Sequence, residues 1–298
     1  METKQSNRVP EANVVHEMSV EGSSLVTGKL STGKLVSRSA ASVALLVVGL
    51  CFVSFWGSPK SALALQTLPD QTAADQESES AIPPALEEYQ GRLIAQTMHY
   101  RGAPWLVREN REREERCSLM LANSGIQPGM SVCDIGCGNG YYAFRMAELV
   151  GPNGIVYAVD IQPEMLSLLR EEMEKRGVEN IVPILGSVHN PRLPAGSVDI
   201  MVLADVYHEF SHPEQMLKYM RSALKPDGYA ILLEYREEDE DVPIKPLHKM
   251  SKDQIMKEWP VNGFKLIGEF NRLSWQHMMK FSRDDSERDS IQPAPFSK

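Results

Sequence analysis

The chain has 298 residues, of which 42% are hydrophobic and 24% charged, and these ordinary values exclude a fibrous or largely disordered protein. Residues 1–64 carry a net charge of +2 and the rest of the chain carries −11, which argues against a general nucleic-acid binder because acidic surfaces repel phosphate backbones. Four cysteines without a C-x-x-C pair indicate ordinary thiols rather than a disulfide scaffold.

The first ninety residues predict targeting and tethering. A polar N-terminal region, residues 1–39, precedes a hydrophobic segment at residues 40–64, in which residues 40–56 carry no charge. As a helix, this uncharged run is about 25 Å long, the short limit for a membrane span. The segment ends in Ala62-Leu63-Ala64, a pattern that suits signal peptidase. An uncleaved transmembrane anchor and a cleaved signal therefore both remain open.

The charges around this segment predict its orientation. Lys29, Lys34 and Arg38 precede it, whereas residues 65–91 hold six acids and no base. By the positive-inside rule, the N-terminus stays in the cytoplasm and the rest is exported. We therefore expect a membrane-associated or exported protein. Residues 65–90 are acidic and contain prolines, which predicts a disordered linker.

From residue 91 onward, predicted strands and helices alternate. Residues 106–123 predict one charged helix that ends at Gly125. Apolar runs then predict strands, and the stretches between them predict helices. The strands are expected at residues 131–136, 155–160, 181–186, 198–205 and 229–235, and the helices at residues 141–150, 164–176 and 214–224. This alternation is typical of a parallel sheet covered by helices on both faces.

The C-terminal part breaks the alternation. Residues 264–271 and 274–283 predict two strands with almost no connection between them, which indicates a hairpin. The hairpin places an antiparallel strand in an otherwise parallel sheet and brings the count to seven strands. The predicted fold class is therefore α/β, a Rossmann-like seven-stranded mixed sheet at residues 91–283. Residues 284–298 predict a loose polar tail.

A glycine-rich turn follows the first predicted strand and carries the strongest chemical signal. Gly136, Gly138 and Gly140 stand between this strand and a helix, where a ligand can approach the backbone closely. Tyr141 occupies the place of the third glycine of a dinucleotide-binding turn. Asp134 places a carboxylate where a pyrophosphate would lie, and this favours a cationic ligand. Asp160 ends the next strand, at the position from which a carboxylate binds ribose hydroxyls.

Four segments resemble the successive motifs of class I S-adenosylmethionine (SAM)-dependent methyltransferases: VCDIGCGNGYYAFRMA, VYAVDIQPEML, AGSVDIMVLADVYHEF and LKPDGYAILLEYR. The resemblance covers about residues 95–283 and implies that SAM is the co-substrate. It implies that Gly136, Gly138 and Gly140 lie against the methionine part, and that Asp134 lies near its ammonium group.

The resemblance also implies contacts for the rest of the donor. Asp160, followed by Ile161, is expected at the ribose hydroxyls, and Asp205 at the edge of the donor pocket. Many relatives hold the adenine amino group with an acid after the third strand. This chain has Ser187 there, and Ser187 is therefore the expected but weaker substitute.

The chemistry of a sulfonium donor sets what the protein must supply. Such a donor is already activated, so alignment and exclusion of water are the main requirements of in-line methyl displacement. A base is needed only for an acceptor that must lose a proton. Tyr207, His208 and Glu209 are the candidate catalytic residues, and His248 is a weaker candidate. The acidic domain has no separate substrate module, which favours a small-molecule acceptor and no nucleic acid.

Two other functions remain open. His208-Glu209-x-x-His212 matches the H-E-x-x-H pattern of zinc metallopeptidases, which would fit an exported enzyme. That pattern needs both histidines on one helical face, and Pro213 directly after His212 disfavours this geometry, so we expect no metal. The other alternative is a non-catalytic domain that binds SAM without turnover.

Overall fold

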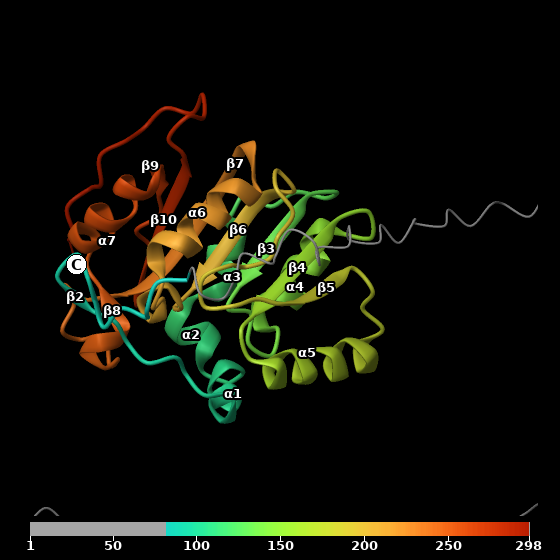
Figure 1. Cartoon of the computed structure of the whole chain (residues 1–298). Helices are drawn as coiled ribbons and strands as arrows, with labels where there is room; N and C mark the ends of the chain where they lie inside the picture. Colours follow the sequence, from blue (N-terminus) through green and yellow to red (C-terminus); the bar gives the residue numbers. More distant parts are fainter. Residues whose placement is uncertain (1–81, 298) are drawn as a thin grey trace, which may run out of the picture. The chain divides into compact units, whose positions relative to one another are not determined.

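The structure is a computed structural model that describes residues 82–297 (Figure 1). All of them belong to one compact unit, Leu68–Lys298. The predicted N-terminal region, the anchor or signal at residues 40–64 and most of the predicted linker lie outside the described residues. Within residues 82–297, no helix is both long enough and apolar enough to cross a membrane.

A twisted mixed sheet forms the centre of the domain, in the strand order β5-β4-β3-β6-β7-β10-β9. Its strands are β3 (Ser131–Ile135), β4 (Ile155–Asp160), β5 (Ile181–Leu185), β6 (Val198–Ala204), β7 (Leu224–Arg236), β9 (Phe264–Glu269) and β10 (Gln276–Arg283). The first five pair in parallel. Short strand β8 (Lys249–Met250) pairs in parallel with β7, and β1 (Glu88–Tyr89) pairs separately with β2 (Arg92–Leu93). The structure thus confirms the seven predicted strands of the sheet and adds the short strand β8 beside the C-terminal end of β7.

The C-terminal hairpin has the predicted topology. Strand β10 lies between β7 and β9 and is antiparallel to both. Met278 stands opposite Leu233 of β7, and Phe281 stands opposite Leu266 of β9. All four side chains are buried. The first pair belongs to one core cluster and the second pair to the other, so the hairpin completes the core on both faces of the sheet.

The described helices cover both faces of the sheet (Figure 1). They are α1 (Ala103–Leu106), α2 (Arg111–Glu115), α3 (Cys117–Ala122), α4 (Tyr141–Val150), α5 (Pro163–Arg176), α6 (Pro213–Ala223) and α7 (Lys252–Glu258), with 3₁₀ turns at Tyr100–Gly102, Tyr207–Glu209, Pro246–His248 and Pro260–Asn262. The predicted helices at residues 141–150, 164–176 and 214–224 correspond to α4, α5 and α6 within one residue at each end.

Strand side chains alternate between the two helical layers, as the period of two along a strand requires. In β6, Ile200 and Val202 belong to the core cluster formed with α3, α4 and α5, whereas Met201 and Leu203 belong to the cluster formed with α6 and α7. All four side chains are at most 1% exposed. Burial of each stabilises the fold by about 1.5–3 kcal/mol relative to exposure.

The prediction of one helix at residues 106–123 was wrong, because the structure divides this stretch among α1, α2 and α3. Arg116 adopts a left-handed conformation with φ of 56° between α2 and α3. The break accompanies burial of Glu115, whose carboxylate accepts hydrogen bonds from Arg108 Nη2 (2.6 Å) and Arg111 Nε (2.8 Å). This buried ion-pair network depends on tertiary contacts that helical periodicity cannot indicate.

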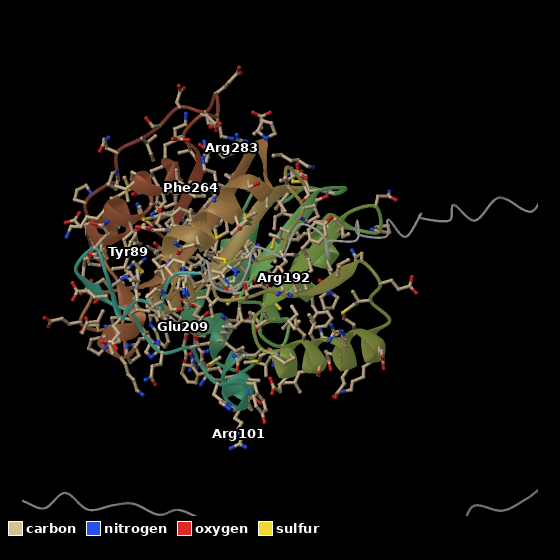
Figure 2. All side chains as sticks on the ribbon, viewed as in Figure 1. Tyr89, Arg101, Arg192, Glu209, Phe264 and Arg283 are labelled. Carbon is tan, nitrogen blue, oxygen red and sulfur yellow. The ribbon has the colours of Figure 1, made fainter. Side chains whose placement is uncertain are left out.

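The structure also differs from the expected linker and tail at their described ends. Leu86 N donates to Ser211 O (2.9 Å), and the buried Tyr89 hydroxyl accepts from Asn262 Nδ2 (2.9 Å) (Figure 2). In the C-terminal segment, Ile291 N donates to Leu266 O (2.8 Å) and Ala294 O accepts from Lys252 Nζ (2.9 Å). Both polar segments therefore contact the domain.

Candidate functional site

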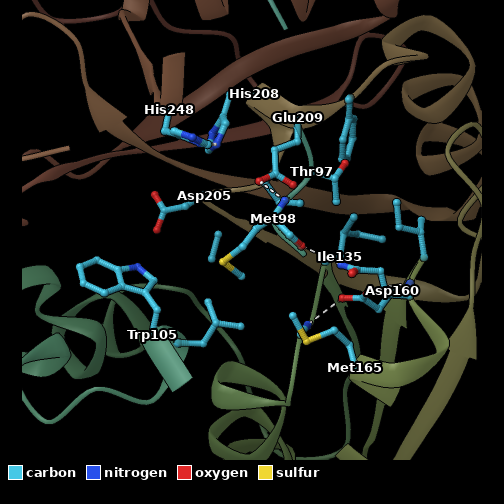
Figure 3. A pocket seen from close by; sticks show the side chains of 18 of the residues that line it. Thr97, Met98, Trp105, Ile135, Asp160, Met165, Asp205, His208, Glu209 and His248 are labelled. Atoms are coloured by element: carbon cyan, nitrogen blue, oxygen red, sulfur yellow. Dashed lines mark hydrogen bonds between the residues drawn. The ribbon is translucent and has the colours of Figure 1, made fainter. Parts of the chain in front are cut away.

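A cavity of about 420 Å³ opens at the carboxyl ends of β3, β4 and β6 (Figure 3). Ligands commonly bind at this edge of open α/β sheets. Seven of the predicted site residues line the cavity: Gly136, Gly138, Asp160, Ile161, Asp205, His208 and Glu209. Residues that follow three separate strand ends in the sequence therefore lie at one cavity, and their roles in binding stay a prediction.

The turn after β3 brings bare backbone to the cavity wall. Gly136 and Gly138 have φ angles of +71° and +53°, in the left-handed region that favours glycine. A Cβ atom on Gly136 would lie 2.5 Å from Val206 Cγ2, and one on Gly138 would lie 2.5 Å from Leu106 Cδ1. Any side chain at these positions would be strained and would enter space beside the cavity.

Asp160 is fixed at the end of β4 by the backbone around it. Its Oδ2 accepts from Gly138 N (2.9 Å), and its Oδ1 accepts from Gln162 N (2.8 Å). Burial raises the pKa of Asp160, although these backbone N–H groups lower it. Each carboxylate oxygen has a second lone pair, so the side chain can still accept hydrogen bonds from a ligand in the cavity.

Two further carboxylates near the cavity are buried with incomplete hydrogen bonding. Asp134 Oδ2 and Asp205 Oδ1 have no hydrogen-bond partner among residues 82–297. Burial raises the pKa of Asp134 to about 7, despite the opposing effect of Arg111. The pKa of Asp205 is also well above its usual value, because of burial and the nearby acids Glu115 and Glu234. A cationic ligand would offset this accumulation of acidic groups.

Asp205 holds a strained backbone conformation at the end of β6. Its φ angle of 54° is uncommon for a residue other than glycine, and such strain is frequent at binding sites. Gln276 Nε2 of β10 donates to its Oδ2 (2.6 Å). The C-terminal hairpin therefore contributes directly to the orientation of this candidate residue.

Four predicted site residues do not line the cavity: Asp134, Gly140, Ser187 and Tyr207. Asp134 and Gly140 lie in the strand and turn directly beside it. Ser187 instead hydrogen bonds to Asn190 within its own loop, whereas the neighbouring Val188 reaches the cavity. The structure thus gives no contact between Ser187 and the space predicted for the adenine.

The structure corrects the prediction that Tyr207 is catalytic. Its side chain is fully buried and packs against Phe210 and Trp259, with ring centroids at 5.3 and 5.5 Å. The 3₁₀ turn at Tyr207–Glu209 directs His208 and Glu209 to the cavity and Tyr207 into the core cluster on the α6 side. Adjacent residues of a tight turn point in different directions, which the sequence alone did not resolve.

Sequence reasoning missed the arginines on the cavity wall. Arg111 lines the cavity and its Nε donates to Glu115 (2.8 Å), while its guanidinium lies 4.2 Å from the centre of the Tyr141 ring. Arg108 also lines the cavity and stacks on Trp105 at 3.8 Å. A densely charged helix usually signals a solvated face, and only tertiary structure shows that these charges are partly buried.

His208 belongs to a hydrogen-bonded group on another wall. Its Nδ1 lies 2.6 Å from Glu234 Oε2, and its Nε2 lies 3.1 Å from His248 Nδ1. Glu209 stands beside them and accepts from Met98 N (3.1 Å); burial raises its pKa to about 7. One ligand atom from each of His208, Glu209 and His248 lies within 4.8 Å of the others, but the two imidazoles already satisfy each other by hydrogen bonding.

Glu234 and the placement of His248 were not predicted. Glu234 lies in the apolar strand β7, and an acid within a buried strand is itself a signal, because an unpaired charge there would be costly. His248 lies forty residues beyond His208, in a 3₁₀ turn before β8. Nothing in the sequence indicates that this turn meets the end of β6.

The H-E-x-x-H segment does not have the geometry of a zinc peptidase. His208 lies in a 3₁₀ turn, whereas His212 is the N-cap residue of α6, which begins at Pro213. His212 Nε2 bonds to Pro83 O (2.8 Å) and its Nδ1 bonds to Ser211 Oγ (3.0 Å). His212 is therefore held away from His208 by contacts with the N-terminal segment.

Replacement of His212 by alanine tests its structural role. Because the imidazole is 5% exposed and hydrogen bonded, we expect a stability loss of about 0.5–1.5 kcal/mol, larger than for an exposed connector residue. Ligand binding in the cavity should remain at the wild-type level, measured by calorimetry beside a thermal unfolding curve. Loss of a bound metal ion together with activity would contradict this assignment.

Comparisons with known proteins identify the family of the domain. A family model described as a methyltransferase domain matches residues 126–285. The chain is 30% identical over 171 residues to the ubiquinone/menaquinone biosynthesis C-methyltransferase UbiE of Cupriavidus pinatubonensis, covering 57% of this chain and 67% of that protein. It is 36% identical over 103 residues to the nocamycin O-methyltransferase of Saccharothrix syringae, covering 34% and 36% of the two chains.

A solved structure supports the fold. The SAM-dependent methyltransferase from Aquifex aeolicus superimposes with a TM-score of 0.59 at 24% identity, over 62% of this chain and 98% of that chain. The chain spans 59% and 67% of the length of two of the UbiE relatives that it matches. The likeness to the solved structure thus concerns the fold of the domain.

Proposed function

Because the chain belongs to the methyltransferase domain family, we propose that it transfers a methyl group from SAM to a small-molecule acceptor bound in the cavity at the ends of β3, β4 and β6. One observation carries the proposal. Backbone of the left-handed Gly136 and Gly138 forms one side of the cavity, and buried acids with unsatisfied oxygens lie beside it. This combination suits a ligand that is both closely packed and cationic.

The residues fit the separate parts of SAM. Gly136 and Gly138 line the cavity without a side chain, which leaves room for the methionine part. A Cβ on either residue would meet a neighbouring side chain. Asp134 has an unpaired carboxylate oxygen for the ammonium group, and Asp160 is oriented to accept from the ribose hydroxyls. Ile161 lines the cavity next to Asp160, where it can pack against the nucleoside.

The protein's contribution to methyl transfer is mainly positional. SAM supplies an activated methyl group on a sulfonium centre. The fixed Asp160 and the glycine turn hold the donor in one orientation, and effective alignment of donor and acceptor accounts for much of the acceleration of such displacements. Met98, Trp105 and Leu106 line the same cavity and exclude water from it.

We also propose that the acceptor is a small molecule. The cavity volume of about 420 Å³ is in the range of small-ligand pockets, and two relatives are enzymes whose names denote a quinone-pathway C-methyltransferase and a nocamycin O-methyltransferase. Incubation of the full chain with methyl-deuterated SAM and fractionated small metabolites tests this. A labelled small product with equimolar S-adenosylhomocysteine supports transfer, whereas SAM binding without any product supports a non-catalytic binding domain.

The affinity for SAM should depend on pH through Asp134. Its pKa is about 7 in the free protein, and a bound ammonium group favours the carboxylate, so binding lowers this pKa and releases a proton. SAM affinity should therefore rise with pH, by up to about ten-fold per unit, and level off above pH 7. Calorimetry between pH 5.5 and 8.5 measures this.

Two variants test whether Asp134 is the group responsible for the pH dependence of SAM affinity. Asp134→Asn should bind more weakly above pH 7 and should lose most of the dependence. Glu209→Gln should retain it, although the pKa of Glu209 is also raised to about 7. A dependence that persists in Asp134→Asn and vanishes in Glu209→Gln would contradict the placement of the ammonium group.

We propose that residues 40–64 direct the domain to or across a membrane. The proposal is based on the distribution of charges around this segment. Mass spectrometry of the mature N-terminus would distinguish an anchor from a cleaved signal, and protease accessibility in intact cells would determine the side of the membrane. A full-length chain in the soluble cytoplasmic fraction would contradict this proposal.

A further inference from the structure

Three side chains from distant parts of the sequence form one continuous hydrogen-bonded chain beside the cavity. Glu234 of β7 lies 2.6 Å from His208 Nδ1, and His208 Nε2 lies 3.1 Å from His248 Nδ1. Glu234 is fully buried and His208 is 2% exposed, whereas His248 is half-buried and lines the cavity. Figure 3 shows His208 and His248 side by side, with Glu209 next to them. The three hydrogen-bonded side chains therefore connect the core to the cavity.

The chemistry of these groups determines which ring nitrogen of each histidine carries a proton. A carboxylate only accepts hydrogen bonds, and Glu234 also accepts from His208 N (3.2 Å), so Nδ1 of His208 carries a proton. In neutral His208 the Nε2 atom is then an acceptor, and Nδ1 of His248 must donate to it. Nε2 of His248 consequently has a free lone pair, and among residues 82–297 it has no hydrogen-bond partner in the structure.

Surrounding charges determine where an additional proton would rest. His208 faces Glu234 and Glu209, with Arg92 opposing them, and the attraction of Glu234 outweighs burial to raise the pKa of His208. His248 faces His208 and Lys245, and burial with these cations lowers its pKa. A proton taken up at His248 is therefore more stable after transfer to His208, beside the buried carboxylate.

Resting on the methyltransferase function proposed above, we propose that His248 is the base that removes a proton from a weakly acidic hydroxyl group of the acceptor, and that His208 and Glu234 position and relay it. The hydroxyl proton moves to His248 Nε2 while the Nδ1 proton of His248 moves to His208 Nε2. The acceptor's electron pair forms the new bond to the methyl carbon, and the pair of the broken C–S bond remains on sulfur. The sulfonium charge is thus replaced by an imidazolium charge beside Glu234.

This arrangement specifies the class of acceptor. A neutral alcohol is too weakly acidic for an imidazole base to ionise effectively, whereas a phenol or an enol is close enough in acidity for efficient proton transfer. The cavity around His248 also includes the apolar residues Ile244 and Pro243. The geometry therefore points to an apolar phenol or enol, which the donor methylates at oxygen or at the conjugated carbon.

Nitrogen NMR of the histidine rings tests the relay without a known acceptor. In the full chain with ¹⁵N-labelled histidine, high pH should give Nδ1–H tautomers for both His208 and His248. On acidification, His208 should become the imidazolium and His248 should switch to the Nε2–H tautomer in the same titration. Glu234→Gln should lower the pH of this joint transition by about one unit or more, because the anionic partner is removed.

The chain offers a matched control. Glu238 forms a similar pair with the buried His277 (2.7 Å), so Glu238→Gln should change the His277 signals and leave the joint transition in place. Independent titration of His208 and His248, or a single His248 tautomer throughout, would overturn the relay. Stoichiometric zinc that is lost in His248→Asn would overturn it as well.

Calorimetry with SAM on the same samples separates this proposal from the function on which it rests. Wild type and Glu234→Gln should bind SAM alike, because Glu234 does not line the cavity. Intact SAM binding with independent histidine titrations would refute only the relay. Absence of SAM binding in the wild type would refute the methyltransferase function, whatever the histidines do.

Discussion

Replacement of Gly138 by valine is expected to abolish binding of SAM. The residue has φ of +53°, and a Cβ atom would lie 2.5 Å from Leu106 Cδ1. A β-branched side chain is strongly disfavoured in this region of backbone space, and its two methyl groups would occupy the side of the cavity where we place the methionine part. The backbone N–H that Gly138 donates to Asp160 would also be displaced. Calorimetry should therefore detect no binding at SAM concentrations at least a hundred-fold above the wild-type Kd.

A second glycine separates the effect on the site from backbone strain. Gly196 has φ of +60°, and a Cβ atom there would meet nothing within 4 Å. Gly138→Ala and Gly196→Ala therefore impose similar conformational strain, but only the first adds an atom at the cavity. We expect both to lose stability on thermal unfolding and only Gly138→Ala to lose affinity for SAM. Equal SAM affinity in the two variants would contradict the placement of the donor.

Replacement of Asp160 by alanine is expected to weaken SAM binding by about 1.5–3 kcal/mol, the usual range for hydrogen bonds to a charged group. This loss corresponds to about a ten- to hundred-fold increase in Kd. The carboxylate also orders the turn through Gly138 N and Gln162 N, so the alanine variant loses part of the preorganised site. Asp160→Asn retains one acceptor oxygen. Its Kd for SAM, measured by calorimetric titration, should therefore lie between those of the wild type and Asp160→Ala.

Asp199 provides the control for this substitution. Its carboxylate also accepts from a backbone group, Ser131 N (2.9 Å), but at the opposite end of the parallel strands. Asp199→Ala should lower stability, because it also removes the contact with Lys225 (2.7 Å), and it should leave the Kd for SAM unchanged. Wild-type affinity in Asp160→Ala would show that the ribose lies elsewhere.

The sheet could be predicted from the sequence because its signals are local. Strands β3, β4, β5 and β6 are short apolar runs, and α4, α5 and α6 lie in intervals between the parallel strands. Strand β7 contains the predicted run at residues 229–235 and begins five residues earlier, at Leu224. The near absence of a connection before β10 was enough to predict the antiparallel hairpin. The break at Arg116 could not be predicted, since it accompanies the buried contacts of Glu115 with Arg108 and Tyr235.

The site residues that could be predicted from the sequence are those that lie close to the ends of strands. Gly136, Asp160 and Asp205 lie at or directly after the ends of parallel strands and therefore meet at one edge. Glu234 and His248 reach His208 only through the pairing of β7 with its neighbours and the turn before β8. Twenty-six and forty residues separate them from His208, and no periodicity or spacing records such a contact.

Titration of the purified full chain with SAM in a calorimeter tests the central claim most directly. The structure predicts one molecule of SAM per chain in the wild type, weaker binding in Asp160→Ala and none in Gly138→Val, with Asp199→Ala and Gly196→Ala unchanged. A wild-type chain that binds no SAM, or a Gly138→Val chain that binds it as tightly as the wild type, would contradict the assignment of this cavity to the methyl donor.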